Sequence, residues 1–476
     1  MSACYYRIML VVALFLKGCA LQPESSERAE MIEVPSMDQT LKESGLEQSG
    51  LWPTVNWWQR FQSPELERLI VTALKDSPNI KLVAARLRQS QTEVDTQAAE
   101  LYPTIQANVS FSAQRFSSNS TQAKLAGEHF RQVLINPMVL RYHLDLWGRD
   151  KAALQASVGR ALAAKNELAD ARLLLSIAVA KVYFDLVAAE KKMINARKIV
   201  RCWEQLLNLN QVLLDQGLVS TGAILNAEFA LNQARQLAIA SRAEMKIDQN
   251  RLATLAGKGA DWGRGIVTAA GRIPEIPELP EQLPLHLLAH RPDIQAMRLR
   301  VEAASEQIKV AETKFYPDVN LVSFAGLHSV SITDVLLQGS SLAYAVGPSI
   351  EFPLFEGGRL RAGLNYREAA YDEAVEAYNG QLLKAVQEVA DALVRLRESD
   401  ARLSEQYRTI TAITKTRKLS EVLYHQGLSD RLQLLHALCA EYTEHFNLAS
   451  LESYRLKATT VLIRALGGGF VAKATK

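Results

Sequence analysis

The segment TIQANVSFSAQRF, residues 104–116, decides the fold because it alternates between polar and apolar side chains. Its odd-numbered positions from 105 to 113, including Ile105, Val109 and Phe111, are apolar, whereas the even-numbered positions are polar. A period of two residues predicts an extended strand with one apolar face. Ten or more residues of this kind, with small polar residues on the second face, are typical of a transmembrane β-barrel strand.

Three further segments alternate in the same way, at residues 138–146, 318–330 and 341–355. We therefore expect two β-hairpins, at 104–147 and 318–355. The smallest bacterial membrane barrels have about eight strands, so four strands per chain predict an oligomer, and three copies would supply twelve. Two soluble hairpins would show the same alternation, so the strands alone leave both interpretations open.

The sequence contains an internal duplication. SPNI at 77–80 returns as RPDI at 291–294, 214 residues later, and QGL at 216–218 returns at 426–428, 210 residues later. A constant offset on each side of one small length change indicates a tandem duplication. Each copy has the same order: a helix up to Tyr-Pro, two alternating segments, a very long helix, a Gln-Gly-Leu turn and a second helix.

The very long helices carry a heptad pattern. Between Asp150 and Gln216 apolar residues such as Leu175, Val179 and Val182 recur every three or four positions, and the second copy repeats the phase. Heptad spacing predicts helices packed side by side at small crossing angles. A helix of 67 residues is about 100 Å long, so we expect it to project from any compact core.

These patterns predict a domain organisation. We expect a signal peptide at 1–18, a lipidated N-terminal tether at 19–60, a first structural repeat at 61–257, a Gly- and Pro-rich linker at 258–284, a second structural repeat at 285–469, and a C-terminal tail at 470–476. The net charge of +3 gives no footprint for nucleic-acid binding.

The N-terminus resembles a bacterial lipoprotein leader. Arg7 precedes a nine-residue apolar core at 8–16, far shorter than the roughly 20 residues that cross a bilayer. Leu16-Lys17-Gly18-Cys19 resembles a lipobox, which implies cleavage before Cys19 and lipidation of its thiol. Lys17 departs from the small uncharged residue that is usual there, so an uncleaved or conventionally cleaved leader is the alternative. Ala20 favours sorting to the outer membrane.

No site of chemistry is predicted. Cys202 and Cys439 lie in helical patterns at positions that do not match in the repeat, so we expect two helix-packing thiols rather than a disulfide. His286 and His290 stand four residues apart, a spacing that can hold a metal on a helix, but no third ligand accompanies them. No group of residues has the pattern of a phosphate-binding loop or a catalytic triad. We expect no enzymatic activity, no cofactor and no metal.

Three strings are the most specific in the chain: LAHRPDI at 288–294, PLFEGGR at 353–359 and LGGG at 466–469. Together with the duplication, the hairpins, the projecting helices and the lipobox, they resemble the trimeric TolC-like outer-membrane factors, in their NodT-type efflux lipoprotein branch. The resemblance covers almost the whole chain. It implies a mainly α-helical homotrimer in the outer membrane of a Gram-negative bacterium, with a twelve-stranded transmembrane β-barrel continuous with a periplasmic helical tunnel.

The resemblance also implies the working surfaces of the chain. Two helix-turn-helix tips would contact a periplasmic adaptor protein; they consist of Gln216, Gly217, Leu218, Val219, Ser220, Thr221 and Gly222, and of Gln426, Gly427, Leu428, Ser429, Asp430 and Arg431. A pore aperture would lie at Tyr424, Gln433 and His436. Family members often carry aspartates at the positions of Gln433 and His436. We hypothesise that His436 makes closure of this aperture pH-sensitive.

The expected function is the outer-membrane channel of a tripartite efflux system, which would export small toxic compounds or drugs received from an inner-membrane pump. Two alternatives stay open: a conduit for type I protein secretion, and a periplasmic helical scaffold lipoprotein that does not span the membrane.

Overall fold

The computed structural model describes residues 28–45, 51–115, 117, 119, 129–266, 268, 289–329 and 339–472. Cys19, the expected signal peptide at 1–18 and most of the expected linker at 258–284 lie outside these described residues. The elements are α2 Asp38–Ser44, η1 Trp57–Phe61, α3 Pro64–Asp76, α4 Pro78–Ala99, β1 Thr104–Arg115, β2 His129–His143, α5 Arg149–Asp215, α6 Thr221–Leu255, α7 Ala260–Gly263, α9 Pro292–Thr313, β3 Asp318–Ser329, η3 Gly339–Ser341, β4 Leu342–Glu351, α10 Arg359–His425 and α11 Arg431–Ala465.

The duplication is visible in the lengths of the elements. Helices α4 and α9 have 22 residues each and strands β1 and β3 have 12 each. Helices α5 and α10 have 67 residues each, and α6 and α11 have 35 each. Each pair starts 214 or 210 residues apart, as the sequence repeat requires. The predicted mainly α-helical fold, with four strands from a duplicated chain, is confirmed.

The chain forms two compact units. The sheet unit contains residues 1–31, 87–163 and 297–378, and the helical unit contains residues 32–86, 164–296 and 379–476. Both 67-residue helices contribute residues to each unit. No described helix combines the length with the apolar composition that a membrane-crossing helix requires.

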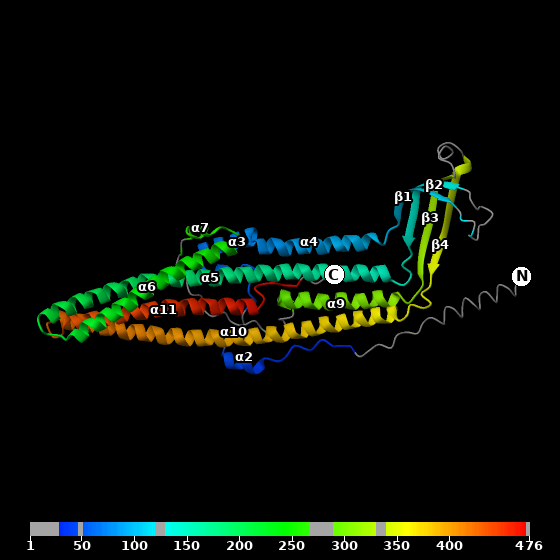
Figure 1. The fold of residues 1–476 in the computed structure, drawn as a ribbon. Helices are drawn as coiled ribbons and strands as arrows, with labels where there is room; N and C mark the ends of the chain where they lie inside the picture. The colour runs from blue at the N-terminus through cyan, green and yellow to red at the C-terminus, as the bar shows by residue number, and fades with distance from the viewer. Residues whose placement is uncertain are drawn as a thin grey trace. The chain divides into compact units, whose positions relative to one another are not determined.

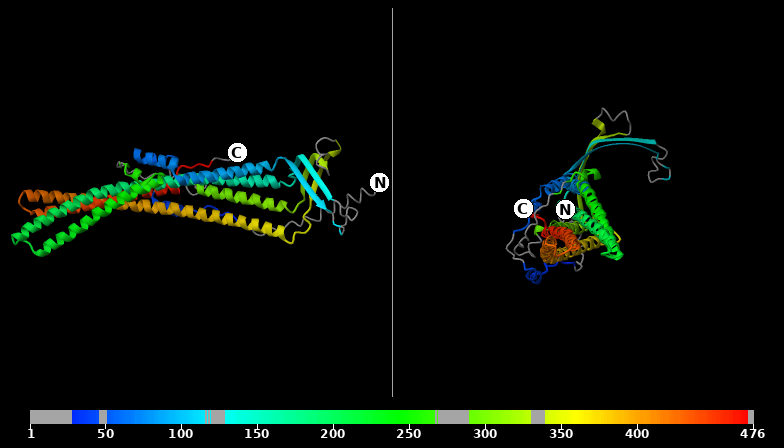
Figure 2. Two further views of the ribbon diagram at one scale, coloured as in Figure 1. Left: turned by 45° about the horizontal axis from the view of Figure 1, so that its top comes forward. Right: turned by 90° about the vertical axis from the view of Figure 1, so that its left-hand side faces the viewer.

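The sheet unit is built on one antiparallel sheet in the order β1-β2-β3-β4 (Figure 1). Ile105 pairs with Leu140 across β1 and β2, and Val319 pairs with Ile350 across β3 and β4. Irregularities in the register interrupt the ladder at two points, between Gln106 and Asn108 and between Ile135 and Met138. Figure 2 shows the sheet as a curved surface, which is expected because bulges increase the local twist.

The helices of the sheet unit pack closely against one another. Ile308 and Ala311 of α9 are buried against Leu364 of α10. A side chain at Gly159 of α5 would place its Cβ 3.1 Å from the Cβ of Ala303, so α5 and α9 approach as closely as a glycine allows.

The core of the helical unit surrounds α5 near its middle. Trp57 and Phe61 of η1 are buried, and the ring of Phe61 lies 4.9 Å from that of Phe184. The hydroxyl groups of Ser63 and Tyr183 share a hydrogen bond of 2.9 Å within the same core. The aromatic residues of η1 are thus part of the hydrophobic core of the helical unit.

The structure differs from the expected tether at 19–60. In the sheet unit, Arg28 forms an ion pair of 3.1 Å with Glu368 of α10. In the helical unit, the Ile32 amide donates to Asn379 at 3.0 Å, and Met37 and Leu41 are buried with residues of α10 and α11. The polar composition concealed these contacts, because Met37 and Leu41 are isolated apolar residues in a polar stretch.

Candidate functional site

The two predicted tips have the same backbone construction in the helical unit. Helix α5 ends at Asp215 and α10 ends at His425, and each is followed by a glycine with a left-handed backbone, Gly217 at φ 71° and Gly427 at φ 73°. The amide of Leu218 donates to the Leu213 carbonyl at 2.8 Å, which closes the helix end as in a Schellman motif. Only glycine adopts this φ without steric cost, so the two Gln-Gly-Leu strings set where the helices reverse.

The tips expose apolar side chains at equivalent positions. Leu218 and Leu428 are each 71% exposed, and their neighbours Val212, Leu225, Leu419 and Val422 are also exposed. Single exposed leucines are ordinary, but here the two occupy equivalent positions of the duplicated tips.

The second tip is capped more firmly than the first. Asp430 is the N-cap of α11, where its carboxylate accepts from the Gln433 amide at 2.8 Å, and Ser429 donates its hydroxyl proton to the Gln433 side chain. Ser220 makes no side-chain cap bond at the start of α6. An N-cap bond contributes about 1 kcal/mol, so the start of α11 has a stabilising bond that the start of α6 lacks.

The three predicted aperture residues lie near the second tip but have different surroundings. The ring of Tyr424, in the last turn of α10, lies 5.7 Å from that of His425. Gln433 is exposed and takes part in the cap of α11. His436 is exposed and its ring lies edge-on to Trp203 of α5 at 5.8 Å.

Helices α5 and α11 form a continuous antiparallel contact, which we call the central seam. Lys191 pairs with Glu452 at 2.6 Å, the ammonium of Lys198 lies 5.3 Å from the Tyr442 ring centroid, and Trp203 contacts His436. The residue numbers along the seam rise on α5 as they fall on α11. The first helix of one repeat is therefore packed against the second helix of the other.

The predicted helix-packing thiols were wrong. Cys202 and Cys439 form a disulfide across the central seam, with Cα atoms 5.7 Å apart. Comparing equivalent repeat positions could not find this pair, because the seam joins helices that are not equivalent. The two cysteines are buried with Leu206 and Leu435, so apolar packing surrounds the bridge.

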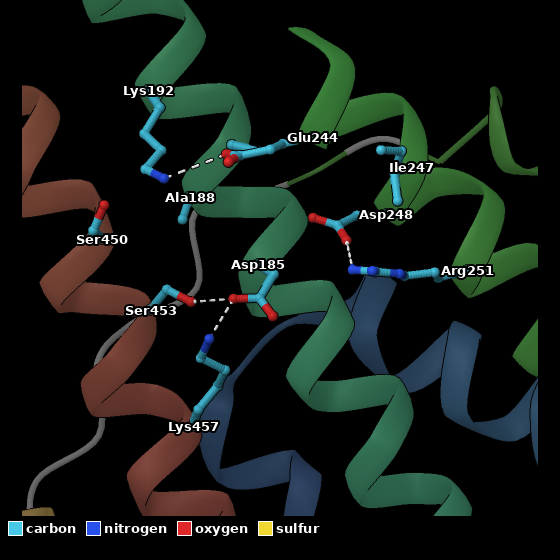
Figure 3. Close-up of a pocket in the computed structure, with 11 residues that line it drawn as sticks. Asp185, Ala188, Lys192, Glu244, Ile247, Asp248, Arg251, Ser450, Ser453 and Lys457 are labelled. Carbon is cyan, nitrogen blue, oxygen red and sulfur yellow. Dashed lines mark hydrogen bonds and ion pairs between the residues drawn. The ribbon is translucent and has the colours of Figure 1, made fainter. Parts of the chain in front are cut away.

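A charged pocket of about 420 Å³ lies where α5, α6 and α11 meet. Figure 3 shows Asp185 accepting from Ser453 and Lys457, Glu244 paired with Lys192, and Asp248 paired with Arg251. Burial, with the nearby charge of Asp185, raises the pKa of Asp248. No pattern in the sequence points to this pocket, because the apolar row of α5 continues through Val182, Leu186 and Ala189 without a break.

A buried ionic cluster joins the start of α9 to α10. Arg291 donates to Asp293 at 2.6 Å and to Glu388 at 2.8 Å. Burial opposes ionisation of Asp293, but the Arg291 guanidinium outweighs it and the pKa of Asp293 is lowered. Burial raises the pKa of the neighbouring Asp170 to about 6, and the charge of Asp293 adds to the effect.

One group among the described residues has the geometry of a cation site. Ligand atoms of His143, Asp145 and Asp150 lie within 4.8 Å of one another at the end of β2 and the start of α5. Asp150 is bonded to His143 and lies 3.3 Å from Arg149, and Asp145 accepts from the Lys151 amide at 3.1 Å. These bonds indicate that the three side chains stabilise the first turn of α5.

The chain matches the family model described as outer membrane efflux protein over residues 69–258 and 283–468. It is 28% identical over 467 residues to the multidrug resistance outer membrane protein MdtP of Escherichia coli, covering 96% of this chain and 94% of the relative. It is 27% identical to the probable efflux pump outer membrane protein TtgC of Pseudomonas putida, covering 97% and 95%.

Solved structures show the same fold. The outer membrane protein VceC from Vibrio cholerae superposes with a TM-score of 0.79 at 29% identity, covering 88% of this chain and all of that chain. The outer-membrane channel OprN superposes with a TM-score of 0.82 at 24% identity, covering 94% and 98%. A match to the family model over most of the length, in both repeats, settles the membership: this chain belongs to the outer membrane efflux protein family.

Proposed function

We propose that three copies of this chain form an outer-membrane efflux channel, in which a twelve-stranded barrel continues into a periplasmic tunnel of helices. The observation that carries this proposal is the four-stranded sheet, whose outer strands β1 and β4 stand at its two edges. An edge strand presents unpaired backbone donors and acceptors, which are costly in a membrane unless another strand satisfies them. Pairing β4 of one copy with β1 of the next satisfies both edges.

The side chains of the edge strands support a lipid-facing surface. Ile105, Val109 and Phe111 of β1 are exposed on one face, as are Tyr344 and Val346 of β4. Large apolar side chains at every second position need an apolar solvent, whereas the residues between them are small or polar. The alternation therefore fits strands with lipid on one side and a water-filled lumen on the other.

The helices support the same ring closure. Contacts in the helical unit run in the order α6–α5–α11–α10, through Glu204 with Arg235, the central seam, and Arg417 with Glu441. Helices α6 and α10 stand at the ends of this order and carry exposed apolar residues, Phe229 and Ile239 on α6 and Val394 and Leu419 on α10. These are surfaces that a neighbouring copy would cover.

The tips are the proposed docking surface for a periplasmic adaptor. Leu218 and Leu428 offer exposed apolar contacts, and the space beside the Cα atoms of Gly217 and Gly427 is open, so a partner could approach the backbone there. Tyr424, Gln433 and His436 are the proposed aperture beside the second tip. An inner-membrane pump would complete the assembly.

The proposed cargo is small toxic compounds. Relatives are named for multidrug resistance, and one from Burkholderia cepacia for fusaric acid resistance. These names favour small molecules over secreted proteins. A lipid on Cys19 would add an anchor on the periplasmic side.

Drug susceptibility tests the proposal. The chain, produced together with a periplasmic adaptor and an inner-membrane pump, should raise drug tolerance in a Gram-negative strain that lacks its own efflux channel. The same adaptor and pump without the chain are the control. Equal susceptibility with and without the chain, when the protein is present in the outer membrane, would argue against the efflux function.

A further inference from the structure

The disulfide between Cys202 and Cys439 is the one covalent link between the helices of the two repeats in the described part of the chain. A disulfide holds its two Cα atoms between about 4.4 and 6.8 Å apart. The observed separation of 5.7 Å leaves the two helices about 1 Å of freedom at this level. Both cysteines are buried, at 2% and 3% exposure, so the surrounding side chains also oppose relative movement.

The other helix contacts at the same depth are weaker. Arg235 and Glu204, which join α6 to α5, are a half-exposed pair at 3.2 Å, and exposed ion pairs of this kind contribute little to stability. Arg417 and Glu441, which join α10 to α11, are more buried and lie 2.7 Å apart, but they are not covalently joined. The four helices are therefore linked covalently at the centre of the order α6–α5–α11–α10 and by non-covalent contacts at its ends.

The bridge lies close to both tips. Cys202 is 14 residues before Gln216, and Cys439 is nine residues after Asp430, which correspond to about 21 and 14 Å along the helices. The two tip surfaces are thus carried by helices that are fixed to each other near their ends. A partner that binds both tips therefore finds them at a fixed distance from each other, so less conformational entropy is lost on binding.

We propose that this bridge keeps α5 and α11 of each protomer in a fixed position relative to each other. The periplasmic end then opens at the interfaces between neighbouring copies. This inference rests on the proposed channel function. Widening an aperture requires displacements of several Å, which the bridge forbids between α5 and α11. The movement then falls to α6 and α10, the outer helices with exposed apolar faces. Cys202 and Cys439 are positioning residues in this scheme.

Planar-bilayer recordings of the full-length protein test the inference. We compare the oxidised wild type, the wild type reduced with a phosphine and checked for two free thiols by alkylation, and the Cys202→Ser/Cys439→Ser variant. Freeing the central seam should raise the ratio of open to closed time by about fivefold or more in both altered forms, the effect of a constraint worth roughly 1 kcal/mol. Leu206→Val, which loosens the same apolar cluster and keeps the bridge, should leave the ratio unchanged.

Three results would overturn the inference, and a fourth would overturn the proposed function. Equal open times in the oxidised, reduced and serine forms would overturn the inference and leave the channel function standing, as would a loss of opening when the bridge is removed. If Leu206→Val mimics the serine variant, the effect belongs to packing and the inference fails. A wild type that never conducts would instead overturn the proposed function on which the inference rests.

Discussion

Arg291 and Glu388 form an ion pair of 2.8 Å although they are 97 residues apart and the arginine is only 2% exposed. The same guanidinium binds Asp293, and one of its nitrogens donates to the Ala465 carbonyl at 3.3 Å. Arg291 therefore connects the start of α9, the middle of α10 and the end of α11. It belongs to the RPDI string that also marks the second repeat.

Replacing Arg291 should destabilise the helical unit strongly. Arg291→Met leaves Asp293 and Glu388 buried without their partner, and removing one member of a buried pair costs about 3–5 kcal/mol. Arg298→Met is the matched control, because Arg298 pairs with Glu302 on the surface; exposed pairs contribute about 0–1 kcal/mol. Thermal unfolding in detergent, followed by circular dichroism, should show a lower midpoint for Arg291→Met alone. Equal midpoints for the two variants would contradict the assignment.

Asp170 should make stability depend on pH. Its pKa in the folded chain is about 6 instead of 3.8, chiefly through burial. Between these values the folded state keeps a proton that the unfolded chain has released, so its contribution to stability is present below about pH 4 and is lost as the pH rises through 6. The full effect is up to about 3 kcal/mol.

Asp170→Asn removes this titration, because an amide stays neutral throughout the range. The difference in stability between the variant and the wild type should therefore grow in favour of the variant from pH 4 to pH 7. Asp95→Asn, at an exposed position of α4, is the control. Denaturant titrations at several pH values measure the difference, and curves that stay parallel for Asp170→Asn would refute the prediction.

The apolar face of β4, which carries Val346, should not tolerate a charged side chain. Val346 is 73% exposed, and an arginine facing lipid costs about 2–4 kcal/mol at mid-membrane depth. Val346→Arg should therefore reduce the amount of heat-resistant oligomer on gels. Ala345→Arg, on the opposite face of the same strand, would point into the lumen and should leave the oligomer intact. An equal loss of heat-resistant oligomer in both variants would mean that the two faces of β4 do not contact different solvents, lipid on one side and water on the other.

The tip leucines should matter for docking and not for folding. Leu218→Ser/Leu428→Ser removes two exposed apolar side chains, so we expect a loss of drug tolerance with unchanged oligomer and unchanged thermal midpoint. Leu82→Ser, an exposed leucine of α4, is the control and should keep tolerance. Susceptibility assays beside gel analysis separate the two effects. Full tolerance in the double variant would remove the tips from the docking surface.

Much of the fold could be predicted because its signals are local or periodic. The alternation from 104 to 116 predicts β1, which spans Thr104–Arg115. The repeated Gln-Gly-Leu strings predict both helix reversals to within a residue. Heptad spacing predicts long neighbouring helices, and α5 has the expected 67 residues.

The features that could not be predicted depend on which helix meets which. The bridge between Cys202 and Cys439 requires α5 to contact α11. The heptad pattern shows that α5 packs against other helices, but it does not show that α11 is one of them. The pocket around Asp185 and Asp248 depends on three helices meeting at one level. The contacts of Met37 and Leu41 with α10 were missed because two apolar residues in a polar segment leave no pattern.

The central claim is that copies of this chain close a continuous channel, and single-channel recording of the purified oligomer in a planar bilayer tests it most directly. The account predicts discrete conductance steps from the wild type, and none from a Val346→Arg preparation that fails to form the oligomer. A correctly folded, oligomeric wild type that inserts into the bilayer and shows no conductance under any voltage would contradict the account.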